Sequence, residues 1–389
     1  MKHNIQLTVL ALCGILLFSA CKKEKVAANS KTFNLAKFTA NLKMQIAASG
    51  ATAPEGYSFV ITRDGQIADS FSMGNARKST AGGNTLWNTN QEINVASVTK
   101  TFTAVAVFQL LKKNNLSITD KIGDWLPTYF NATQTIKNLT FEELMSHSSG
   151  MLEGSTGFDS MIAIVRRPLA DPAKKKNQYA NINFGIFRAI IPYLRDKSGA
   201  AMQESTMIPA NPSGFETWLS NAYIGYMQSN VFTPIGLGVT NCKPSANTAQ
   251  AFSEPSGPGQ AVANLSDWTE SSGGGGYFMS VLEMARFNVF IANAYTLLDK
   301  DQRALMDSKY LGWDTGDSRM TYAGRAYGKN GALRWDNDGN GLDAGDAGLQ
   351  TLIIKFPNKV ELALAINSLS GSWRSLSGMA TVAYDLSWE

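Results

Sequence analysis

The sequence predicts an α/β fold: one antiparallel sheet, built from both ends of the chain and flanked by helices, with a mainly helical lobe inserted between its halves. Two observations carry the prediction. A helical pattern and then a hairpin pattern open the body of the chain, and a hairpin and then a helical pattern close it. In addition, 44% of the 389 residues are hydrophobic and 17% are charged, which is typical of a globular protein with a large core.

The chain begins with a segment that is typical of a secretory signal. An apolar run from Leu7 to Phe18 follows a short basic start, and the small residues Ser19 and Ala20 precede Cys21. The run is too short for a stable membrane span. The segment resembles a bacterial lipoprotein signal, in which the cysteine after the cleavage site carries lipid. The alternative is an ordinary signal peptide followed by an unrelated cysteine.

These features divide the chain into three parts. We expect residues 1–20 to be removed as the lipoprotein signal peptide, residues 21–32 to form a polar tether, and residues 33–389 to form the body. Lipid on Cys21 would then anchor the protein to a membrane of the cell envelope, on the periplasmic or outer-membrane face.

The body opens with a helix and a hairpin. Apolar residues recur at helical spacing from Leu35 to Ile46, and Gly50 is a suitable C-terminal stop. Two apolar stretches, Tyr57 to Thr62 and Ile67 to Phe71, flank the dipeptide Asp64-Gly65, which favours a tight hairpin turn.

The body closes with the same two elements in reverse order. Thr351 to Phe356 and Val360 to Ile366 predict two strands, and Pro357-Asn358 between them predicts a turn. A helical pattern follows from about Trp373 to Leu386. The two hairpins are therefore expected to pair in one sheet.

The middle of the chain, roughly residues 120–265, is expected to form the helical lobe. The stretch Thr140 to Glu143 has the capping-box pattern that begins a helix. Asn183 is expected to cap a helix that runs from Phe184 toward Arg195. Between Glu204 and Asp267 the pattern is irregular and rich in Pro, Ser and Asn, so we expect long loops that form pocket walls.

The stretch from Ile93 to Leu111 predicts a buried helix that carries a reactive serine. Lys100 is its only charged residue, and the residues that follow are apolar on nearly every side. In a helix that begins near Ser97, Lys100 lies one turn on, so the two side chains can touch. Burial lowers the pKa of a lysine, and a neutral lysine beside a serine hydroxyl can act as its general base. The alternative is a core helix whose single lysine reaches the surface.

Composition excludes several classes of function. The 35 basic and 31 acidic residues give a net charge of +4. Cleavage of the signal peptide would also remove Lys2 and leave +3, which is too small to indicate nucleic-acid binding. His3 also leaves with the signal, so His147 alone remains, and a metal site built on several histidines cannot form. We expect His147 to have a polar structural role and Cys242 to be a structural thiol. A serine-histidine-aspartate triad would need His147 itself, and the sequence has no Gly-x-Ser-x-Gly motif. The base for a serine nucleophile is therefore expected to be a lysine, or a tyrosine supported by lysine.

Three short motifs follow one another along the chain: Ser97-x-x-Lys100, Tyr179-Ala180-Asn181 and Lys329-Asn330-Gly331. Together they resemble the active-site set of the penicillin-recognising serine hydrolases, which comprise class C β-lactamases, low-molecular-mass DD-peptidases and related esterases. The resemblance covers most of residues 35–389, with poor agreement from Glu204 to Asp267. It implies a β-lactamase-like fold with the active site between the sheet and the helical lobe.

The resemblance implies catalytic roles for three residues. Ser97 corresponds to the nucleophile and Lys100 to its hydrogen-bonded base. Tyr179 corresponds to the group that passes the proton to the leaving group and helps to activate the deacylating water. A tyrosine needs neighbouring cations to act as a base near neutral pH, because its ordinary pKa is about 10.

The resemblance also implies a binding role for the other motif residues. Asn181 corresponds to the amide that orients substrate, and Lys329 to the cation that lowers the tyrosine pKa and receives a substrate carboxylate. Gly331 belongs to the same substrate-binding motif. The backbone N–H groups of Ser97 and Ala332 correspond to the oxyanion hole, whose donors contribute about 3 kcal/mol each to such reactions.

The sequence departs from the family pattern at two places. Asn330 stands where threonine or serine is usual, which bears on carboxylate recognition and on β-lactam turnover. An Asp-rich loop then follows, in which several residues fit positions of a calcium-binding loop but the usual glutamate is missing. The loop is either a metal-free turn or a structural calcium site, and the expected ligands are Asp336, Asp338, Asn340, Asp343 and Asp346.

We therefore expect a serine hydrolase that forms an acyl-enzyme at Ser97 and acts on an ester or amide, in the manner of a DD-peptidase or an esterase. Retention of Lys329 favours a substrate that carries a carboxylate, such as a D-amino-acid peptide. The alternatives are a β-lactamase and a catalytically inactive lipoprotein that binds cell-wall peptide. The expected partners are a small-molecule or peptide substrate and, through the lipid, a membrane; no nucleic acid is expected. No cofactor is required, and a structural calcium ion is expected only if the Asp-rich loop is a calcium site.

Overall fold

The computed structural model describes residues 31–48, 53–79, 83–169, 177–254, 256–343, 345–369 and 373–389. The expected signal peptide, the lipid site Cys21, most of the tether and the stop at Gly50 lie outside the described residues, so these stay predictions. In the described part of the chain, no helix is both long enough and apolar enough to cross a membrane.

One large sheet forms the base of the molecule, and its pairing joins the two ends of the chain. Among the described residues it has nine strands, and β13, β5, β11, β12, β1, β2 and β3 follow one another across it, while β10 pairs with β11 and β6 with β5. The strands are β1 (Gly56–Arg63), β2 (Gln66–Arg77), β3 (Thr85–Leu86), β5 (Ala251–Ser253), β6 (Val262–Ala263), β10 (Tyr327–Trp335), β11 (Ala347–Lys355), β12 (Val360–Ile366) and β13 (Ser368–Leu369).

The two predicted hairpins are confirmed, and they pair as expected. Strand β1 pairs antiparallel with β2 on one side and with β12 on the other, in a register that sets Tyr57 opposite Ile366. Asp64 and Gly65 have φ values of 51° and 81°, the left-handed conformation that a tight turn between two strands requires. Every residue of β11 and β12 is buried, because helices cover both faces of the sheet.

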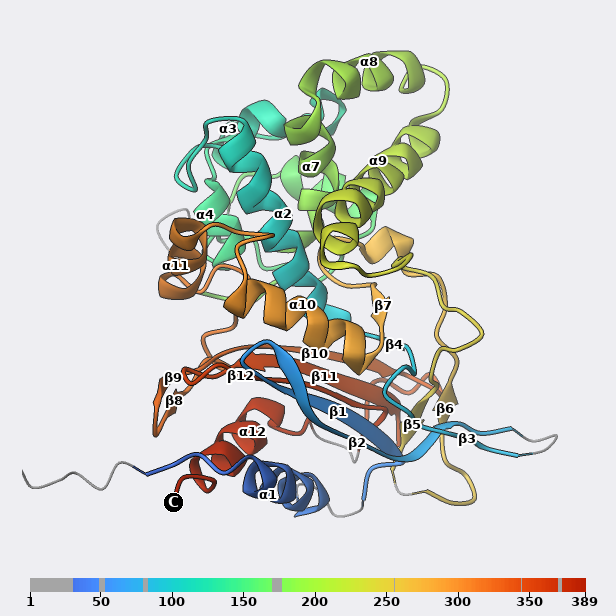
Figure 1. The fold of residues 1–389 in the computed structure, drawn as a ribbon. Coiled ribbons are helices and arrows are strands. Elements are labelled where there is room, and N and C mark those ends of the chain that lie inside the picture. Colours follow the sequence, from blue (N-terminus) through green and yellow to red (C-terminus); the bar gives the residue numbers. More distant parts are fainter. Residues whose placement is uncertain are drawn as a thin grey trace, which may run out of the picture.

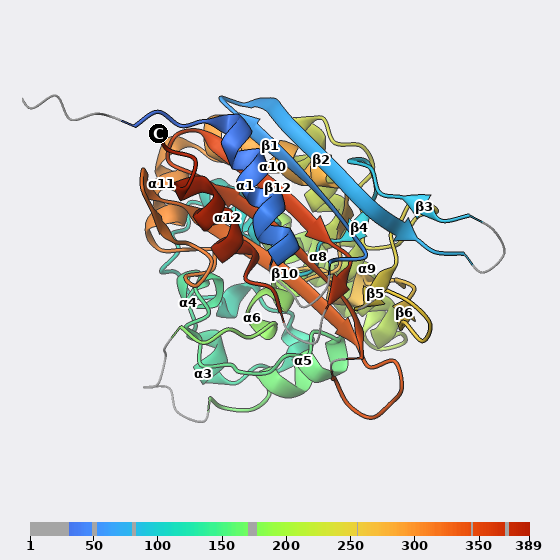
Figure 2. The same ribbon diagram turned by 90° about the horizontal axis from the view of Figure 1, so that it is seen from below.

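Two helices from opposite ends of the chain cover the lower face of the sheet (Figure 2). Helix α1 (Leu35–Ala48) buries its apolar stripe there, as predicted, and α12 (Leu376–Asp385) lies beside it. The ring of Tyr384 stacks on that of Phe356 at 4.1 Å, which fixes α12 to the end of β11. The closing helix was predicted from Trp373, but it begins at Leu376.

The remaining helices lie above the sheet, and α10 (Val281–Asn293) separates them from its strands (Figure 1). Helix α2 (Thr99–Lys113) runs up from the sheet into this layer, and twelve of its fifteen residues, Lys100 among them, are buried, which confirms the predicted buried helix. The other helices are α3 (Gln134–Lys137), α4 (Phe141–Met145), α5 (Phe158–Val165), α6 (Ile182–Gly185), α7 (Phe187–Arg195), α8 (Lys197–Met207), α9 (Pro212–Met227) and α11 (Lys300–Ser308).

Several short elements complete the fold. Strand β4 (Ile93–Asn94) pairs with β7 (Phe278–Met279), and a single 3₁₀ turn, η1 (Ala96–Val98), leads from β4 into α2. A small hairpin of β8 (Met320–Thr321) and β9 (Gly324–Arg325) precedes β10.

The middle of the chain is partly as predicted. The capping box at Thr140 and Glu143 is present at the start of α4. The segment from Glu204 to Asp267 was expected to be loops, yet it contains α9, which Asn211 caps and Pro212 begins. It also contains β5 and β6, which pair with each other and with the main sheet, so the boundary of the lobe near residue 265 was placed too late.

The predicted cap at Asn183 is wrong. Asn183 lies inside α6, is fully buried, and accepts a hydrogen bond from the hydroxyl of Ser149. The amide of Asn183 therefore ties α6 to the loop after α4 instead of ending a helix.

Candidate active site

The local backbone presents Ser97 at the junction between the sheet and the helical layer. Ser97 is the central residue of η1, and the preceding Ala96 has a φ of 48°, a left-handed value that alanine rarely adopts. The side-chain oxygen of Asn94 accepts from the backbone N–H of Ala96 at 2.8 Å and holds this turn. A strained residue that is held by its surroundings is common beside reactive groups.

Lys100 is fully buried, and its ammonium has three partners from three parts of the chain. It donates to the Ser97 hydroxyl at 3.0 Å, to the side-chain oxygen of Asn181 at 2.9 Å, and to the backbone oxygen of Gly274. A buried amine must be hydrogen-bonded or lose its proton, and these three acceptors meet that requirement. The predicted contact between Ser97 and Lys100 is therefore present.

Tyr179 completes the group around the nucleophile. Its hydroxyl lies 2.6 Å from the Ser97 hydroxyl oxygen and donates to it. The ammonium groups of Lys100 and Lys329 lie 5.0 Å and 4.8 Å from the centre of its ring. Although 46% of the residue is exposed, its hydroxyl points inward to this group, so the phenol is open to a substrate on one side only.

The electrostatics of the group favour proton transfer. Burial lowers the pKa of Lys100. The charge of Tyr179 opposes this effect and the charge of Lys329 adds to it, and the net pKa is lowered. Burial alone would raise the pKa of Tyr179, but the charges of Lys100 and Lys329 outweigh it and the net pKa is lowered. Both changes bring the pKa values of Lys100 and Tyr179 nearer to neutral pH, and a base with such a pKa can accept the proton of Ser97.

The edge strand β10 forms the other wall of the site. Gly331 packs so closely on the turn of the nucleophile that a Cβ there would lie 2.2 Å from the backbone oxygen of Val95 and 2.9 Å from the backbone nitrogen of Ser97. Ala332 and Ser97 line one pocket of about 380 Å³. The structure thus brings both predicted oxyanion-hole residues to the same cavity.

Lys329 is placed differently from the prediction. Its ammonium lies near Tyr179, as the motif implied, but it is 1% exposed and bonds both side-chain oxygens of Asp314 at 2.6 Å. The predicted acceptor for this cation was a substrate carboxylate. Sequence reasoning missed Asp314, because nothing in the pattern around it connects it to a residue fifteen positions later.

His147 supports Tyr179, in agreement with its predicted structural role. The two rings lie 4.5 Å apart, and the Nδ1 atom of His147 accepts from the backbone N–H of Ala180 at 3.3 Å. Burial lowers the pKa of His147 to about 2, with further lowering by Lys329 and Lys100. An uncharged imidazole in this place positions the tyrosine loop and does not exchange protons at neutral pH.

The Asp-rich loop gathers three of its predicted calcium ligands. Carboxylate oxygens of Asp336, Asp338 and Asp346 lie within 4.8 Å of one another. Several of these oxygens already accept backbone N–H groups of the loop, for example Asp336 from Gly339 at 2.6 Å. The side chain of Asn340 donates to Asp338 at 2.9 Å. The arrangement fits either alternative for the loop, and the calcium site stays a prediction.

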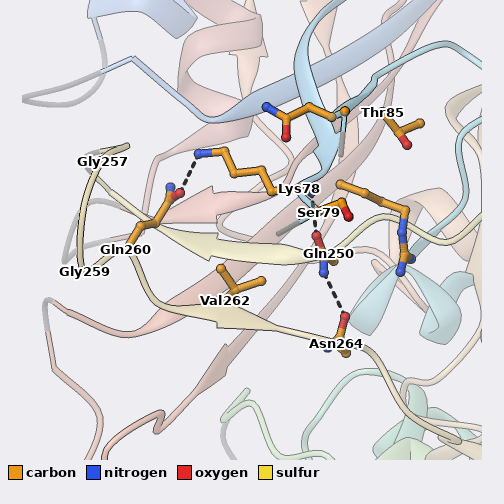
Figure 3. A pocket seen from close by; sticks show the side chains of 12 residues that line it. Lys78, Ser79, Thr85, Gln250, Gly257, Gly259, Gln260, Val262 and Asn264 are labelled. Atoms are coloured by element: carbon orange, nitrogen blue, oxygen red, sulfur yellow. Dashed lines mark hydrogen bonds between the residues drawn. The ribbon is translucent and has the colours of Figure 1, made fainter. Parts of the chain in front are cut away.

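A second hollow, of about 920 Å³, lies beside β3, β5 and β6, away from the nucleophile (Figure 3). Its polar side chains are bonded to one another: Lys78 donates to Glu55 and Gln260, both at 2.7 Å, and Gln250 donates to Asn264 at 2.9 Å. The Lys78 amine there is thus bonded to a carboxylate and an amide, whereas the Lys100 amine donates to the Ser97 hydroxyl. We therefore assign the candidate active site to the smaller pocket.

Comparisons with known proteins agree with this assignment. A model of the Beta-lactamase family matches residues 45–345. The curated relative Beta-lactamase-like protein 2 of Dictyostelium discoideum is 42% identical over 62 residues, which are 15% of this chain and 11% of that protein. The chain thus matches a short part of that relative's length.

Solved structures with a similar fold include two bacterial proteins. FmtA from Staphylococcus aureus superposes with a TM-score of 0.62 and 16% identity, over 92% of both chains. The beta-lactamase/D-alanine carboxypeptidase from Yersinia pestis has a TM-score of 0.63 and 13% identity, over 90% of this chain and 98% of that chain. At such low identity, the likeness shows the shared fold.

Substitution of Gly331 is expected to impair the site without unfolding the protein. In Gly331→Ala the new methyl group must displace the turn that carries Ser97, and a shift of about 1 Å costs on the order of 100-fold in rate. The measurement is the rate at which a fluorophosphonate labels Ser97. Gly154→Ala is the matched control, because Gly154 lines the same pocket and a Cβ there meets nothing within 4 Å. Equal labelling rates in the two variants would contradict the expectation.

His147 is expected to make the protein less stable as the pH falls below about 6.5. Its pKa is lowered in the folded state, so the unfolded chain binds the proton first and the free energy of unfolding decreases with falling pH. Between pH 7 and pH 5 the loss from this group is about 2 kcal/mol. Urea unfolding of the protein and of His147→Asn at both pH values measures it, and an equal pH dependence in the two proteins would exclude this effect.

Calcium is expected to raise the melting temperature if the Asp-rich loop binds it. Occupancy at a hundred times the dissociation constant stabilises a fold by about 2.7 kcal/mol, which raises the melting temperature by several degrees. The measurement compares calcium with a chelator, and Asp338→Asn serves as the control that should not respond. A melting temperature that is the same with calcium and with chelator would remove the calcium site.

Proposed function

The chain belongs to the Beta-lactamase family, whose model matches its residues 45–345, and we propose that it is a serine hydrolase that forms an acyl-enzyme at Ser97. The reaction is hydrolysis of an ester or amide: the acyl group passes to the serine oxygen and then to water. Members of this family are serine hydrolases, and the proposal assigns the same chemistry to this chain.

One observation carries the proposal: a single hydroxyl lies against both of the groups that could take its proton. The Ser97 oxygen is 3.0 Å from the Lys100 amine and 2.6 Å from the Tyr179 hydroxyl. Both distances are within hydrogen-bond reach, which is the geometric requirement for a general base. A serine in this position is more nucleophilic than an ordinary one, because its proton leaves as the new bond forms.

In the first half of the reaction, the Ser97 oxygen attacks the acyl carbon while its proton moves to Lys100 or Tyr179. The carbonyl oxygen gains negative charge, and the backbone N–H groups of Ser97 and Ala332 are the donors that we assign to it. The leaving group departs with a proton supplied by Tyr179, and an ester bond to Ser97 remains.

In the second half, water attacks the ester bond to Ser97 and the same groups act in reverse. Tyr179 is the open member of the set and is assigned the role of accepting the proton of the water. The acid product leaves and the Ser97 hydroxyl regains its proton, so one water is consumed for each bond broken. The side chain of Asn181 bonds the Lys100 amine and holds it toward the serine throughout.

A fluorophosphonate is expected to add once to the protein, at Ser97. Intact-mass spectrometry measures the adduct, and Ser97→Ala should show none. Lys100→Met should lower the labelling rate by about 100-fold to 10,000-fold, the usual contribution of a general base. Incubation with a penicillin in parallel measures whether the pocket also accepts a β-lactam.

The control is Ser117→Ala, which removes a serine from an exposed loop and should label like the unchanged protein. A folded protein that takes up no fluorophosphonate would refute the hydrolase and favour the inactive binding protein. Labelling that persists in Ser97→Ala would show that another residue is the nucleophile.

A further inference from the structure

The cation that faces the candidate site from β10 is already neutralised by this chain. The Lys329 ammonium lies 2.6 Å from each side-chain oxygen of Asp314, and the two side chains are 1% and 19% exposed. Burial alone would lower the pKa of Lys329, but the charge and hydrogen bonds of Asp314, together with the charges of Tyr179 and Asp317, outweigh it. The net pKa is raised, so the lysine stays protonated. The two groups therefore form a close ion pair that is mostly shielded from water.

The ion pair belongs to the reacting group and not to the surrounding fold. The Lys329 ammonium lies 4.8 Å from the centre of the Tyr179 ring, and the hydroxyl of that ring bonds Ser97. Any substrate group that reached this ammonium would lie within a few ångströms of the Asp314 carboxylate. Two carboxylates at that separation repel each other strongly where water is largely excluded.

Asp314 is held in place by the strand that carries Lys329. Its backbone N–H donates to the backbone oxygen of Gly328 at 3.0 Å, and its own backbone oxygen accepts from Asp317 and Ser318 in a tight turn. The hydroxyl of Ser318 in turn accepts from the backbone N–H of Gly328 at 3.2 Å. The backbone of Asp314 is thus fixed to β10, and its carboxylate is held beside Lys329 by the two bonds to the ammonium.

We propose that Asp314 determines the substrate class by occupying the place of a substrate carboxylate, so that the site takes esters or amides whose leaving group is uncharged and discriminates against those whose leaving group carries a carboxylate. This inference rests on the proposed acyl-enzyme at Ser97 and narrows it. It also replaces the expectation, drawn from the motif alone, that Lys329 favours a carboxylate-bearing substrate.

The test uses two aryl esters of N-phenylacetylglycine that differ by one charge: the leaving group is 3-hydroxybenzoate in one and its methyl ester in the other. The unchanged protein is expected to hydrolyse the methyl ester with a kcat/KM about tenfold or more above that of the carboxylate. Asp314→Asn is expected to raise kcat/KM for the carboxylate by about tenfold or more, mainly through a lower KM. The ratio of the two substrates is the readout, because loss of Asp314 also changes the charge near Tyr179 and with it both rates.

Asp307→Asn is the matched control. Asp307 pairs with Lys355 at 2.8 Å, and the two side chains are 20% and 10% exposed, much like the pair at the site. Asp307 has no contact with Lys329 or Tyr179 among the interactions that the structure shows, so this variant should keep the substrate ratio of the unchanged protein. The Asp307→Asn variant measures how the loss of a comparable aspartate in an ion pair affects the stability and activity of the protein when the site itself is unchanged.

The outcomes separate this inference from the proposed function. A preference of the unchanged protein for the carboxylate would overturn the inference even if Asp314→Asn failed to fold, and an unchanged ratio in a folded Asp314→Asn would also overturn it. Hydrolysis of neither ester by a protein whose Ser97 still takes up fluorophosphonate would likewise count against it. Absence of both hydrolysis and labelling would instead refute the proposed function.

Discussion

The burial of one amine organises the candidate site. Lys100 lies in a helix that is otherwise apolar, so its hydrogen-bonding capacity must be met inside the protein. Its acceptors are Ser97 in the turn η1 before that helix, Asn181 before α6 and the backbone of Gly274. These three segments are far apart in the sequence, and the amine holds them around one point. The reactive geometry is therefore a consequence of satisfying a buried polar group, and loss of the amine would loosen all three segments at once.

The sheet supplies the second constraint, because its edge strand must come very close to the turn that carries the serine. Gly331 has no side chain and packs on the backbone of Val95 and Ser97, and the hydroxyl of Thr351 on the next strand donates to the backbone oxygen of Val95 at 2.8 Å. Backbone groups are fixed more rigidly than side chains, so a site formed from them needs little rearrangement during the reaction. The antiparallel sheet built from both chain ends thus positions the nucleophile from below, while α2 positions it from above.

The sequence predicted those parts that depend on local patterns. The opening helix, both hairpins, the buried helix and the capping box at Thr140 follow from spacing and turn residues, and the three motifs marked the residues that meet at the site. Helix α9 was missed because its apolar residues alternate with Ser, Asn and Gly, which weaken the helical pattern. Strands β5 and β6 are too short for a pattern to show. The pairing of Lys329 with Asp314 depends on a tight turn folding back on β10, and no local pattern predicts such a tertiary contact.

The charges at the site balance in a way that the motifs alone would not give. Lys100, Tyr179, Lys329 and Asp314 carry no net charge if Tyr179 is ionised beside a protonated Lys100, and equally none if the proton has moved from Lys100 to Tyr179. Without Asp314, the same cluster would carry an excess positive charge in both arrangements, and burial penalises such a charge. The aspartate therefore keeps the buried group neutral in both arrangements, so that burial penalises neither of them. The residue that we propose removes the cation from substrate recognition is thus also the residue that balances its charge inside the protein.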